Sequence, residues 1–425
     1  MDGFKPKIVV AQPGARRHYA VPALLHQAGM LAHFFTDAYV GRGSAWQKLP
    51  RLAELLPAGY RPAGLQRLLG RREDGLPPEK VTAFNLFGAA YAWAQRRAKN
   101  GEALERVYRQ YGRRFAEMVR RHSLCQGQGL YTFPSTALPL FQQVSHQGMK
   151  LFLDQFSAPR KIMSHLIKEE YERWPGWEKP NSWAASSTAS LESEKQECHL
   201  ADAIFCPSKF VAQGLESLNI PSDKIFLVPY GVDRGRFSCE RPPWNGHRPL
   251  RLLFVGEVNL LKGVPYLYQA LERLGATEVT ARLVGAVALQ EPYRGLLARR
   301  SELTGLVPRT EIRWHYEWAD LLIFPTICDS FGIVQVEALS AGLPVITTPN
   351  AGSVVRDGVD GFIVPIRDAE ALAEKIDLLA HNAELLGWMS QNAKERSQEF
   401  SWEKYGERLV GTLKDILSSN QADGT

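Results

Sequence analysis

The sequence predicts an α/β protein of two domains, each a mainly parallel sheet covered by helices. The chain has 425 residues, which is long enough for two or three domains. It opens with a strand, a glycine turn, a helix and a second strand, the order that builds a parallel sheet. The same order of elements starts again near residue 250. Two domains in tandem follow from this restart.

The first element of this pattern is a short apolar run at Lys7–Ala11, typical of a central parallel strand. Residues 12–15 then form a turn, and His18–Gln27 carries apolar residues at helical spacing. Gly29 stands where a helix C-cap is expected. Leu31–Val40 supplies the next strand.

The second pattern begins with a strand at Leu250–Val255, a loop at Gly256–Gly263 and a helix at Val264–Leu274. Further short apolar strands are expected at Ala281–Val284, Leu321–Phe324, Val345–Thr348 and Gly361–Val364. Between the two patterns, prolines and polar residues punctuate the chain from Asn219 to Pro249. We therefore divide the chain into residues 1–220 and residues 221–400. A surface loop is expected at Trp174–Ser190.

Composition excludes several classes of protein. The hydrophobic share of 45% and the charged share of 23% are ordinary for a globular protein, and the 35 Gly and 26 Pro exclude a collagen-like or low-complexity chain. The five cysteines form no CxxC pair, which excludes a disulfide scaffold or zinc ribbon and favours a reducing compartment. The N-terminal apolar run is too short for a signal peptide, and no stretch of about 18 apolar residues is present. We expect a cytoplasmic protein.

Charge is distributed unevenly along the chain. Residues 1–125 have a net charge of +12, and the remaining residues have −6. The basic excess is densest in Arg96–Arg121, where apolar residues recur at helical spacing and predict a basic amphipathic helix. Two interpretations stay open. The helix binds the inner face of an anionic membrane or a phosphorylated acceptor, or it packs inward with a solvated charged face.

The stretch most informative for function runs from Pro325 to Ile346. A strand ends at a loop that carries the carboxylate of Asp329, and Gly332 then turns the chain into a helix. The N-terminus of that helix offers free N–H groups to a phosphate or a sugar hydroxyl. Glu337 lies one to two turns further on, where a carboxylate can accept hydrogen bonds from both hydroxyls of a ribose.

This stretch resembles the signature of family 4 of the retaining glycosyltransferases, which have the GT-B fold. Asp329 and Glu337 match the family's two acids in spacing, with Asp in place of the first Glu. The resemblance implies two facing Rossmann-like domains, with the donor nucleotide sugar in the second and the acceptor in the first. It places Glu337 on the nucleotide ribose and Asp329 beside the transferred sugar. Residues 401–425 match a C-terminal helix that crosses back onto the first domain.

Other donor-side residues follow from the same resemblance. Lys262 matches a lysine that neutralises the donor diphosphate, whereas Glu257 stands where the family has an arginine. Arg16 or Arg17 of the first domain is a candidate replacement for that arginine. The other expected donor-binding positions are Gly14, Phe331, Gly332 and Ile333.

Acceptor-side residues are expected around the Gly14 loop. The resemblance brings Arg16, Arg17 and His18 to the acceptor, and Asp154 ends a strand at the same edge of the sheet. Many members carry a histidine near Leu130–Phe133, and this chain has none there.

Missing motifs narrow the choice of function. No Gly-x-Gly-x-x-Gly follows a predicted strand, and there is neither a P-loop nor an Asp-x-Asp pair. These absences disfavour a nicotinamide dehydrogenase, an NTP hydrolase and a metal-held diphosphate. Together with them, the family resemblance implies a metal-independent hexosyltransferase without a cofactor, which moves a sugar from a nucleotide diphosphate to an acceptor hydroxyl. Its partners are the donor and an acceptor of unknown identity, with no nucleic acid. The alternatives are a silent binding module that docks on membranes and an epimerase or phosphorylase of the same fold.

Overall fold

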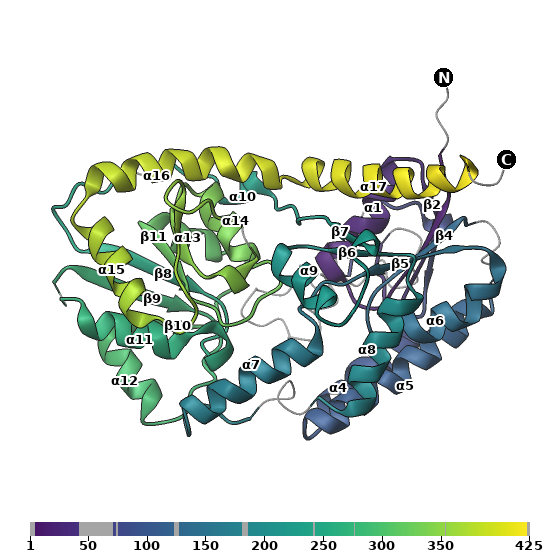
Figure 1. Ribbon diagram of the computed structural model, residues 1–425, viewed down its shortest axis with the longest axis horizontal. Helices are drawn as coiled ribbons and strands as arrows, with labels where there is room; N and C mark the ends of the chain where they lie inside the picture. Colours follow the sequence, from purple (N-terminus) through teal and green to yellow (C-terminus); the bar gives the residue numbers. More distant parts are fainter. Residues whose placement is uncertain are drawn as a thin grey trace, which may run out of the picture.

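The computed structural model describes residues 5–41, 71–73, 75–122, 127–180, 186–240, 243–275, 277–352 and 354–422. Two sheets lie side by side along the long axis of the molecule (Figure 1). The first has seven strands in the order β3-β2-β1-β4-β5-β6-β7, and the second has six in the order β10-β9-β8-β11-β12-β13. Every pair of neighbouring strands is parallel. The predicted α/β class with two parallel sheets is confirmed.

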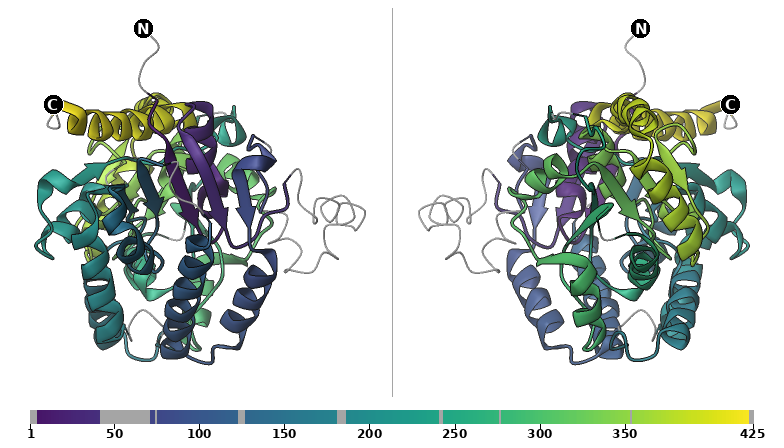
Figure 2. Two further views of the ribbon diagram at one scale, coloured as in Figure 1. Left: turned by 90° about the vertical axis from the view of Figure 1, so that its right-hand side faces the viewer. Right: turned by 90° about the vertical axis from the view of Figure 1, so that its left-hand side faces the viewer.

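The first sheet is built from β1 (Ile8–Gln12), β2 (Leu31–Thr36), β3 (Val81–Ala83), β4 (Gly129–Thr132), β5 (Lys150–Asp154), β6 (Ala203–Cys206) and β7 (Ile225–Leu227). Its helices are α1 (Ala20–Gln27), α4 (Asn85–Arg97), α5 (Gly101–Arg120), α6 (Ala137–Val144), α7 (Arg160–Arg173), α8 (Thr188–Leu200) and α9 (Lys209–Glu216). Val9 and Ala11 share a buried cluster with α5 and α6, whereas Ile8 and Val10 share one with α1 and α17 (Trp402–Ala422). Helices therefore cover both faces of this sheet (Figure 2).

The second sheet contains β8 (Leu250–Val255), β9 (Val279–Val284), β10 (Ser301–Gly305), β11 (Leu321–Phe324), β12 (Val345–Thr347) and β13 (Gly361–Ile363). Its helices are α10 (Arg234–Phe237), α11 (Val264–Arg273), α12 (Tyr293–Arg300), α13 (Ile312–Trp318), α14 (Ile333–Ser340), α15 (Ala369–Ala380) and α16 (Ala383–Arg396). β8 and β11 have the predicted bounds. The edge strand β10 was not predicted, because its sequence Ser-Glu-Leu-Thr-Gly is polar and half-exposed.

The expected helix over 96–121 is two helices. α4 ends at Arg97, and α5 begins after Asn100, whose side chain accepts a hydrogen bond from the Ala103 N–H at 2.9 Å. Phe115 and Val119 of α5 are fully buried. Its apolar stripe therefore packs inward, while most of the cations of this segment are exposed.

The expected surface loop at Trp174–Ser190 is wrong at both of its ends. Trp177 is buried and stacks on Tyr293 of the second domain, with ring centroids 4.7 Å apart. α8 already begins at Thr188. Met163 and Ile167 of α7 also belong to the buried cluster of the second domain, so this part of the chain joins the two domains.

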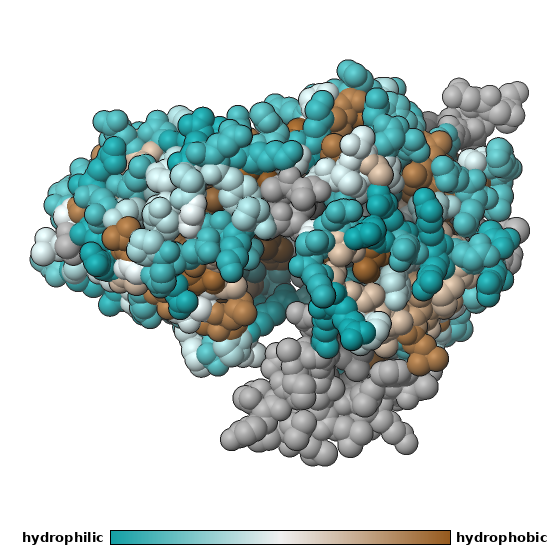
Figure 3. Space-filling view, turned by 90° about the horizontal axis from the view of Figure 1, so that it is seen from below, coloured by the Kyte–Doolittle hydropathy of each residue, from teal (hydrophilic) through white to brown (hydrophobic). Residues whose placement is uncertain are grey.

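The C-terminal helices connect the two domains as the sequence predicts. α16 lies over the second domain, and α17 continues along the same side of the molecule over the first (Figure 1). Leu409 and Leu413 of α17 are buried in the first domain's core. The division at residue 220 stays a prediction, and β7 lies beyond it in the first sheet. The molecule is hollowed between the two domains on the face seen in Figure 3.

Candidate functional site

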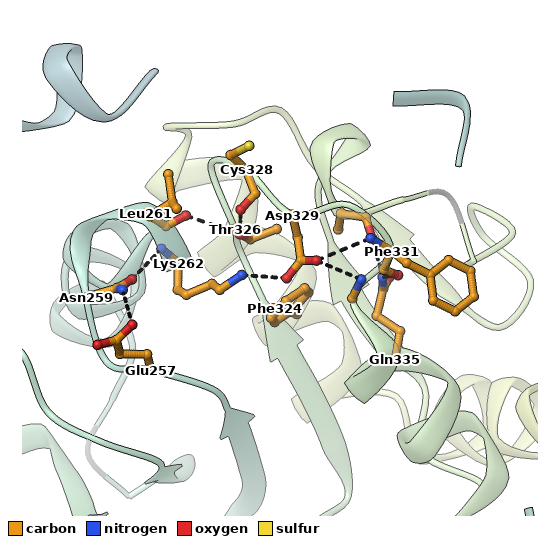
Figure 4. Close-up of polar contacts among 12 residues, drawn as sticks. Glu257, Asn259, Leu261, Lys262, Phe324, Thr326, Cys328, Asp329, Phe331 and Gln335 are labelled. Atoms are coloured by element: carbon orange, nitrogen blue, oxygen red, sulfur yellow. Dashed lines mark hydrogen bonds and ion pairs between the residues drawn. The ribbon is translucent and has the colours of Figure 1, made fainter. Parts of the chain in front are cut away.

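Lys262 and Asp329 form an ion pair where two strands of the second sheet end. Lys262 closes a short helix (η7, Leu260–Lys262) after β8, and Asp329 follows β11. The Lys262 Nζ lies 2.5 Å from the Asp329 Oδ2 (Figure 4). The Asp329 Oδ1 accepts hydrogen bonds from the N–H groups of Phe331, at 3.2 Å, and Gly332, at 3.0 Å. The carboxylate is therefore fixed between a cation and the start of α14.

These contacts keep Asp329 ionised. Burial by itself raises the pKa of this carboxyl, but the charge and hydrogen bond of Lys262 and the two N–H groups outweigh burial and hold its pKa below the ordinary value. Each side chain of the pair is about one-fifth exposed. The pair thus faces open space and can be reached by a ligand.

That space is a cavity of about 390 Å³ between the domains, which we call the Asp329 cavity. Its lining comes from both domains: Arg16, Arg17, Phe156, Tyr230, Val255, Gly256, Lys262, Phe324, Asp329, Ser330, Phe331, Gly332, Ile333 and Val334. The predicted donor-binding residues Lys262, Phe331, Gly332 and Ile333 are thus brought together with Asp329.

Glu337 lines an adjoining cavity of about 550 Å³, the Glu337 cavity, which shares Arg17 and Ile333 with the first. The Tyr316 hydroxyl donates a hydrogen bond to the Glu337 Oε2 at 2.7 Å. Burial raises the pKa of Glu337, although Tyr316 and the charges of Arg309 and Arg236 act to lower it. The two acids of the motif therefore serve neighbouring cavities.

Besides Glu337, two predicted donor residues lie outside the Asp329 cavity. Glu257 is exposed, and its Oε2 accepts a hydrogen bond from the Asn259 side chain at 3.0 Å (Figure 4). Asn259 in turn accepts a hydrogen bond from the Lys262 N–H at 2.9 Å, so Glu257 supports the loop that holds Lys262. Gly14, with φ at +84°, donates its N–H to Asp37 at 2.7 Å and lines a third cavity.

The third cavity has a volume of about 460 Å³ and lies in the first domain where its strands end. We call it the aromatic cavity after six of its lining side chains: Phe87, Tyr91, Tyr108, Tyr111, Phe115 and Phe156. Arg16 and Phe156 line both this cavity and the Asp329 cavity. The two cavities therefore meet at these two side chains.

The acceptor-side candidates separate in the structure. Arg17 forms an ion pair with Asp154, which is only 2% exposed and also accepts a hydrogen bond from Tyr131 at 2.6 Å. Asp154 lines none of the three cavities. His18 is exposed, lines the Glu337 cavity and contacts the side chain of Arg309. Arg16 alone of these residues faces both the donor side and the aromatic cavity.

Sequence reasoning missed several residues of the site. Tyr230 is not among the predicted residues, yet it lines the Asp329 cavity, and its ring centroid lies 4.2 Å from the Arg17 guanidinium. Tyr316 and Arg309 reach Glu337 from a segment with no recognisable pattern. Phe156, two residues after Asp154, carries no signal beyond its place after a strand.

Within the described ranges, no group of three or more His, Cys, Asp or Glu side chains lies close enough to hold a metal ion.

Part of the chain matches a known protein family. Residues 249–382 match the family described as glycosyl transferases group 1. Among curated relatives, a D-inositol 3-phosphate glycosyltransferase of Geodermatophilus obscurus is 30% identical over 213 residues, which cover 44% of this chain and 46% of the relative. An uncharacterised glycosyltransferase of Methanocaldococcus jannaschii is 29% identical over 210 residues, 48% of this chain and 57% of the relative. The chain thus spans about half the length of the curated relatives it matches.

Solved structures resemble the whole chain. HepE of Anabaena in complex with UDP has a TM-score of 0.61 at 13% identity, covering 96% of this chain and 100% of HepE. Sucrose-phosphate synthase from Thermosynechococcus elongatus also has a TM-score of 0.61, at 17% identity, covering 97% and 100%. At these identities the likeness shows the fold, which is GT-B.

Proposed function

Because residues 249–382 match glycosyl transferases group 1, we propose that this protein is a retaining glycosyltransferase. It transfers a sugar from a nucleotide diphosphate to an acceptor hydroxyl. The observation that carries the proposal is the Lys262–Asp329 pair at the start of α14, in a cavity lined by both domains and next to Glu337. That HepE was solved with UDP supports a nucleotide diphosphate as the leaving group.

The donor is held by side chains that differ in charge. Glu337 accepts hydrogen bonds from the ribose hydroxyls, and the hydrogen bond from Tyr316 fixes the orientation of its carboxylate. Lys262 and the N–H groups at the start of α14 stabilise the negative charge that grows on the diphosphate as it leaves. Asp329 positions Lys262 beside the transferred sugar. We assign no protein nucleophile.

Neutralisation by side chains makes a metal unnecessary in this scheme. Turnover should therefore persist at full rate after treatment with EDTA. Loss of turnover that added Mg²⁺ or Mn²⁺ restores would contradict metal independence.

The acceptor occupies the aromatic cavity of the first domain. This cavity meets the Asp329 cavity at Arg16 and Phe156, which brings an acceptor hydroxyl close to the donor sugar. Aromatic faces pack well against the C–H faces of a sugar ring or against another apolar ring. Tyr91→Ala should therefore raise the KM for the acceptor and leave the KM for the donor unchanged.

The surface of α4 and α5 fits an anionic membrane that carries such an acceptor. Leu86 is 82% exposed and Trp93 is 58% exposed, and the guanidinium of Arg97 lies 4.5 Å from the centroid of a Trp93 ring. The two helices and the turn between them carry further exposed cations: Arg96, Lys99, Arg106, Arg113 and Arg114. Each well-placed cation adds about 1 kcal/mol of attraction to anionic lipid, which salt screens. Among the described residues, no helix is both long enough and apolar enough to cross a membrane. The contact that we propose is peripheral.

Vesicle sedimentation tests this surface. We expect binding to vesicles with anionic lipid at low salt, weaker binding at high salt, and weaker binding of Trp93→Ala. Absence of binding at low salt would favour a solvated charged face and an acceptor that is not in a membrane.

The proposed activity is tested with the donor alone. A thermal-shift panel of UDP, GDP, ADP and their sugars should identify the nucleotide. Slow release of that nucleotide from its sugar without acceptor should then be measurable, because the groups that stabilise the leaving diphosphate are in place. Binding with no release under any condition would indicate a silent module, and release coupled to isomerisation of the sugar would indicate an epimerase.

A further inference from the structure

Three cations line the Asp329 cavity, and they differ in how their charge is balanced. Arg17 is paired with Asp154, and Lys262 is paired with Asp329. Arg16 forms no ion pair with any acid in the described part of the chain, and its buried Nε has no hydrogen-bond partner there. Arg16 therefore brings a positive charge to the cavity that no acid among the described residues neutralises by an ion pair.

The position of Arg16 is fixed by packing. Its guanidinium lies 3.7 Å from the centroid of the Phe156 ring and 5.7 Å from that of Phe133. The side chain of Gln12 donates a hydrogen bond to the Arg16 carbonyl at 3.1 Å, which holds the backbone. A stacked guanidinium keeps its edge free for a planar pair of hydrogen bonds, the geometry that suits phosphate.

The pKa values of the two neighbouring arginines, Arg16 and Arg17, are shifted in opposite directions. Burial lowers the pKa of Arg16, and the more distant charge of Asp154 only partly opposes it. Burial also acts to lower the pKa of Arg17, but direct contact with Asp154 raises it well above the ordinary value. An anion at Arg16 would relieve the cost of burying its charge.

The opposite wall of the cavity offers little further positive charge. Gly256 lines the cavity, but the next residue is Glu257, whose carboxylate is exposed and bonded to Asn259. The positive charge of Lys262 is balanced by its ion pair with Asp329. A diphosphate in this cavity would therefore meet its one unbalanced side-chain cation, among the described residues, on the wall made by the first domain.

We propose that Arg16 binds the diphosphate of the donor from the first domain, in place of a cation on the Glu257 side. This inference rests on the proposed function, since it takes the donor to be a nucleotide-diphosphate sugar. Donor binding then bridges the two domains. Arg16 also lines the aromatic cavity, so it stands where donor phosphate and acceptor meet.

Calorimetry with UDP, GDP and ADP, each beside its own nucleoside, tests the proposal. Arg16→Gln should weaken binding of the preferred diphosphate about 10- to 100-fold and change nucleoside binding less than twofold. The matched control is Arg282→Gln. Arg282 stacks on Trp318 at 4.0 Å but lines none of the three cavities, so this change should leave both affinities intact.

A second pair of variants distinguishes a lost phosphate contact from a loss of affinity caused by misfolding. Arg16→Lys keeps the charge without the planar edge and should retain more diphosphate affinity than Arg16→Gln. Glu257→Arg, added to Arg16→Gln, should restore at least a third of the lost affinity on a logarithmic scale, because it supplies a cation next to Gly256.

The outcomes separate the two proposals. If wild-type protein binds none of the three diphosphates, the proposed function fails and Arg16 loses its role with it. If wild-type protein binds one of them and Arg16→Gln binds it equally well, the role of Arg16 is overturned while the proposed function stands. Equal losses for diphosphate and nucleoside would likewise contradict a phosphate contact.

Discussion

Two acid–base pairs at strand ends of the two domains differ in how far they are closed off from solvent. Arg17 and Asp154, in the first domain, are 11% and 2% exposed, and the rings of Tyr230 and Tyr405 lie 4.2 and 5.5 Å from the arginine. Lys262 and Asp329, in the second domain, are 19% and 20% exposed and line the Asp329 cavity.

The difference indicates different roles for chemically similar pairs. Opening the Arg17–Asp154 pair would leave two charges in an apolar aromatic surround, which is costly, so this pair holds structure. The Lys262–Asp329 pair can exchange part of its contact for a ligand, since both groups remain partly hydrated. Arg17 lines the same cavity, but its acid Asp154 is buried away from it, whereas both members of the Lys262–Asp329 pair are open to it. The exposure of the acid to the cavity, and not the identity of the residues, separates the structural pair from the functional one.

The largest effect is expected on stability, at the buried Arg17–Asp154 pair. Asp154→Asn leaves the Arg17 charge buried without its acid and should reduce the free energy of unfolding by about 3–5 kcal/mol. Urea denaturation followed by circular dichroism measures this. Arg17→Gln combined with Asp154→Asn is the control and should recover part of the loss, because no lone charge remains. A single variant as stable as wild type would mean that the pair is not structural.

A change at the Lys262–Asp329 pair should affect the catalytic rate and not the stability of the fold. Lys262→Ala should lower kcat about 10²- to 10³-fold, since its charge matters most as the diphosphate leaves. Its free energy of unfolding should fall by less than about 1 kcal/mol, as for a partly exposed pair. Nucleoside affinity measured by calorimetry should stay unchanged. Normal turnover would place Lys262 outside the donor site.

A smaller effect, on nucleotide binding, is expected at Glu337 in the neighbouring cavity. Glu337→Gln removes a charged acceptor for the ribose hydroxyls and should weaken nucleotide binding by about 1.5–3 kcal/mol. Calorimetry with the ribonucleotide and its 2′-deoxy form provides the control, because the variant should discriminate less between the two. Unchanged affinity would remove Glu337 from the ribose site.

The smallest effect concerns a buried acid that forms no ion pair with any cation in the described ranges. Glu197 accepts hydrogen bonds from the N–H groups of Ser135, at 3.0 Å, and Leu138, at 3.3 Å, much as Asp329 accepts two. Burial raises the pKa of Glu197 to about 8, in contrast to the lowered pKa of Asp329. The folded protein therefore holds a proton that the unfolded chain releases above about pH 4.3.

Stability should accordingly fall as the pH rises towards the folded pKa of Glu197. As the pH rises from 6 to 8, we expect the free energy of unfolding to fall by about 1–2 kcal/mol because of Glu197. Glu197→Gln should remove this part of the pH dependence, which thermal unfolding at several pH values measures. The same slope in variant and wild type would show that Glu197 is not the titrating group.

The sequence by itself determined several of the elements and one motif. Short apolar runs set β8 and β11 to the residue, and positive-φ glycines such as Gly29 and Gly332 mark the end or start of helices. The loop and helix that carry Asp329 and Glu337 also follow from local signals. All of these depend on residues close together in the chain, where periodicity and turn chemistry act directly.

Tertiary structure decided which of the predicted side chains act together. Adjacent arginines have the same local signal, yet only Arg17 meets Asp154, which lies 137 residues away. Tyr316 reaches Glu337 from another helix, and α7 joins the core of the second domain. The charge balance of a cavity depends on which distant acids pack beside each cation, and periodicity along the chain carries no information about that packing.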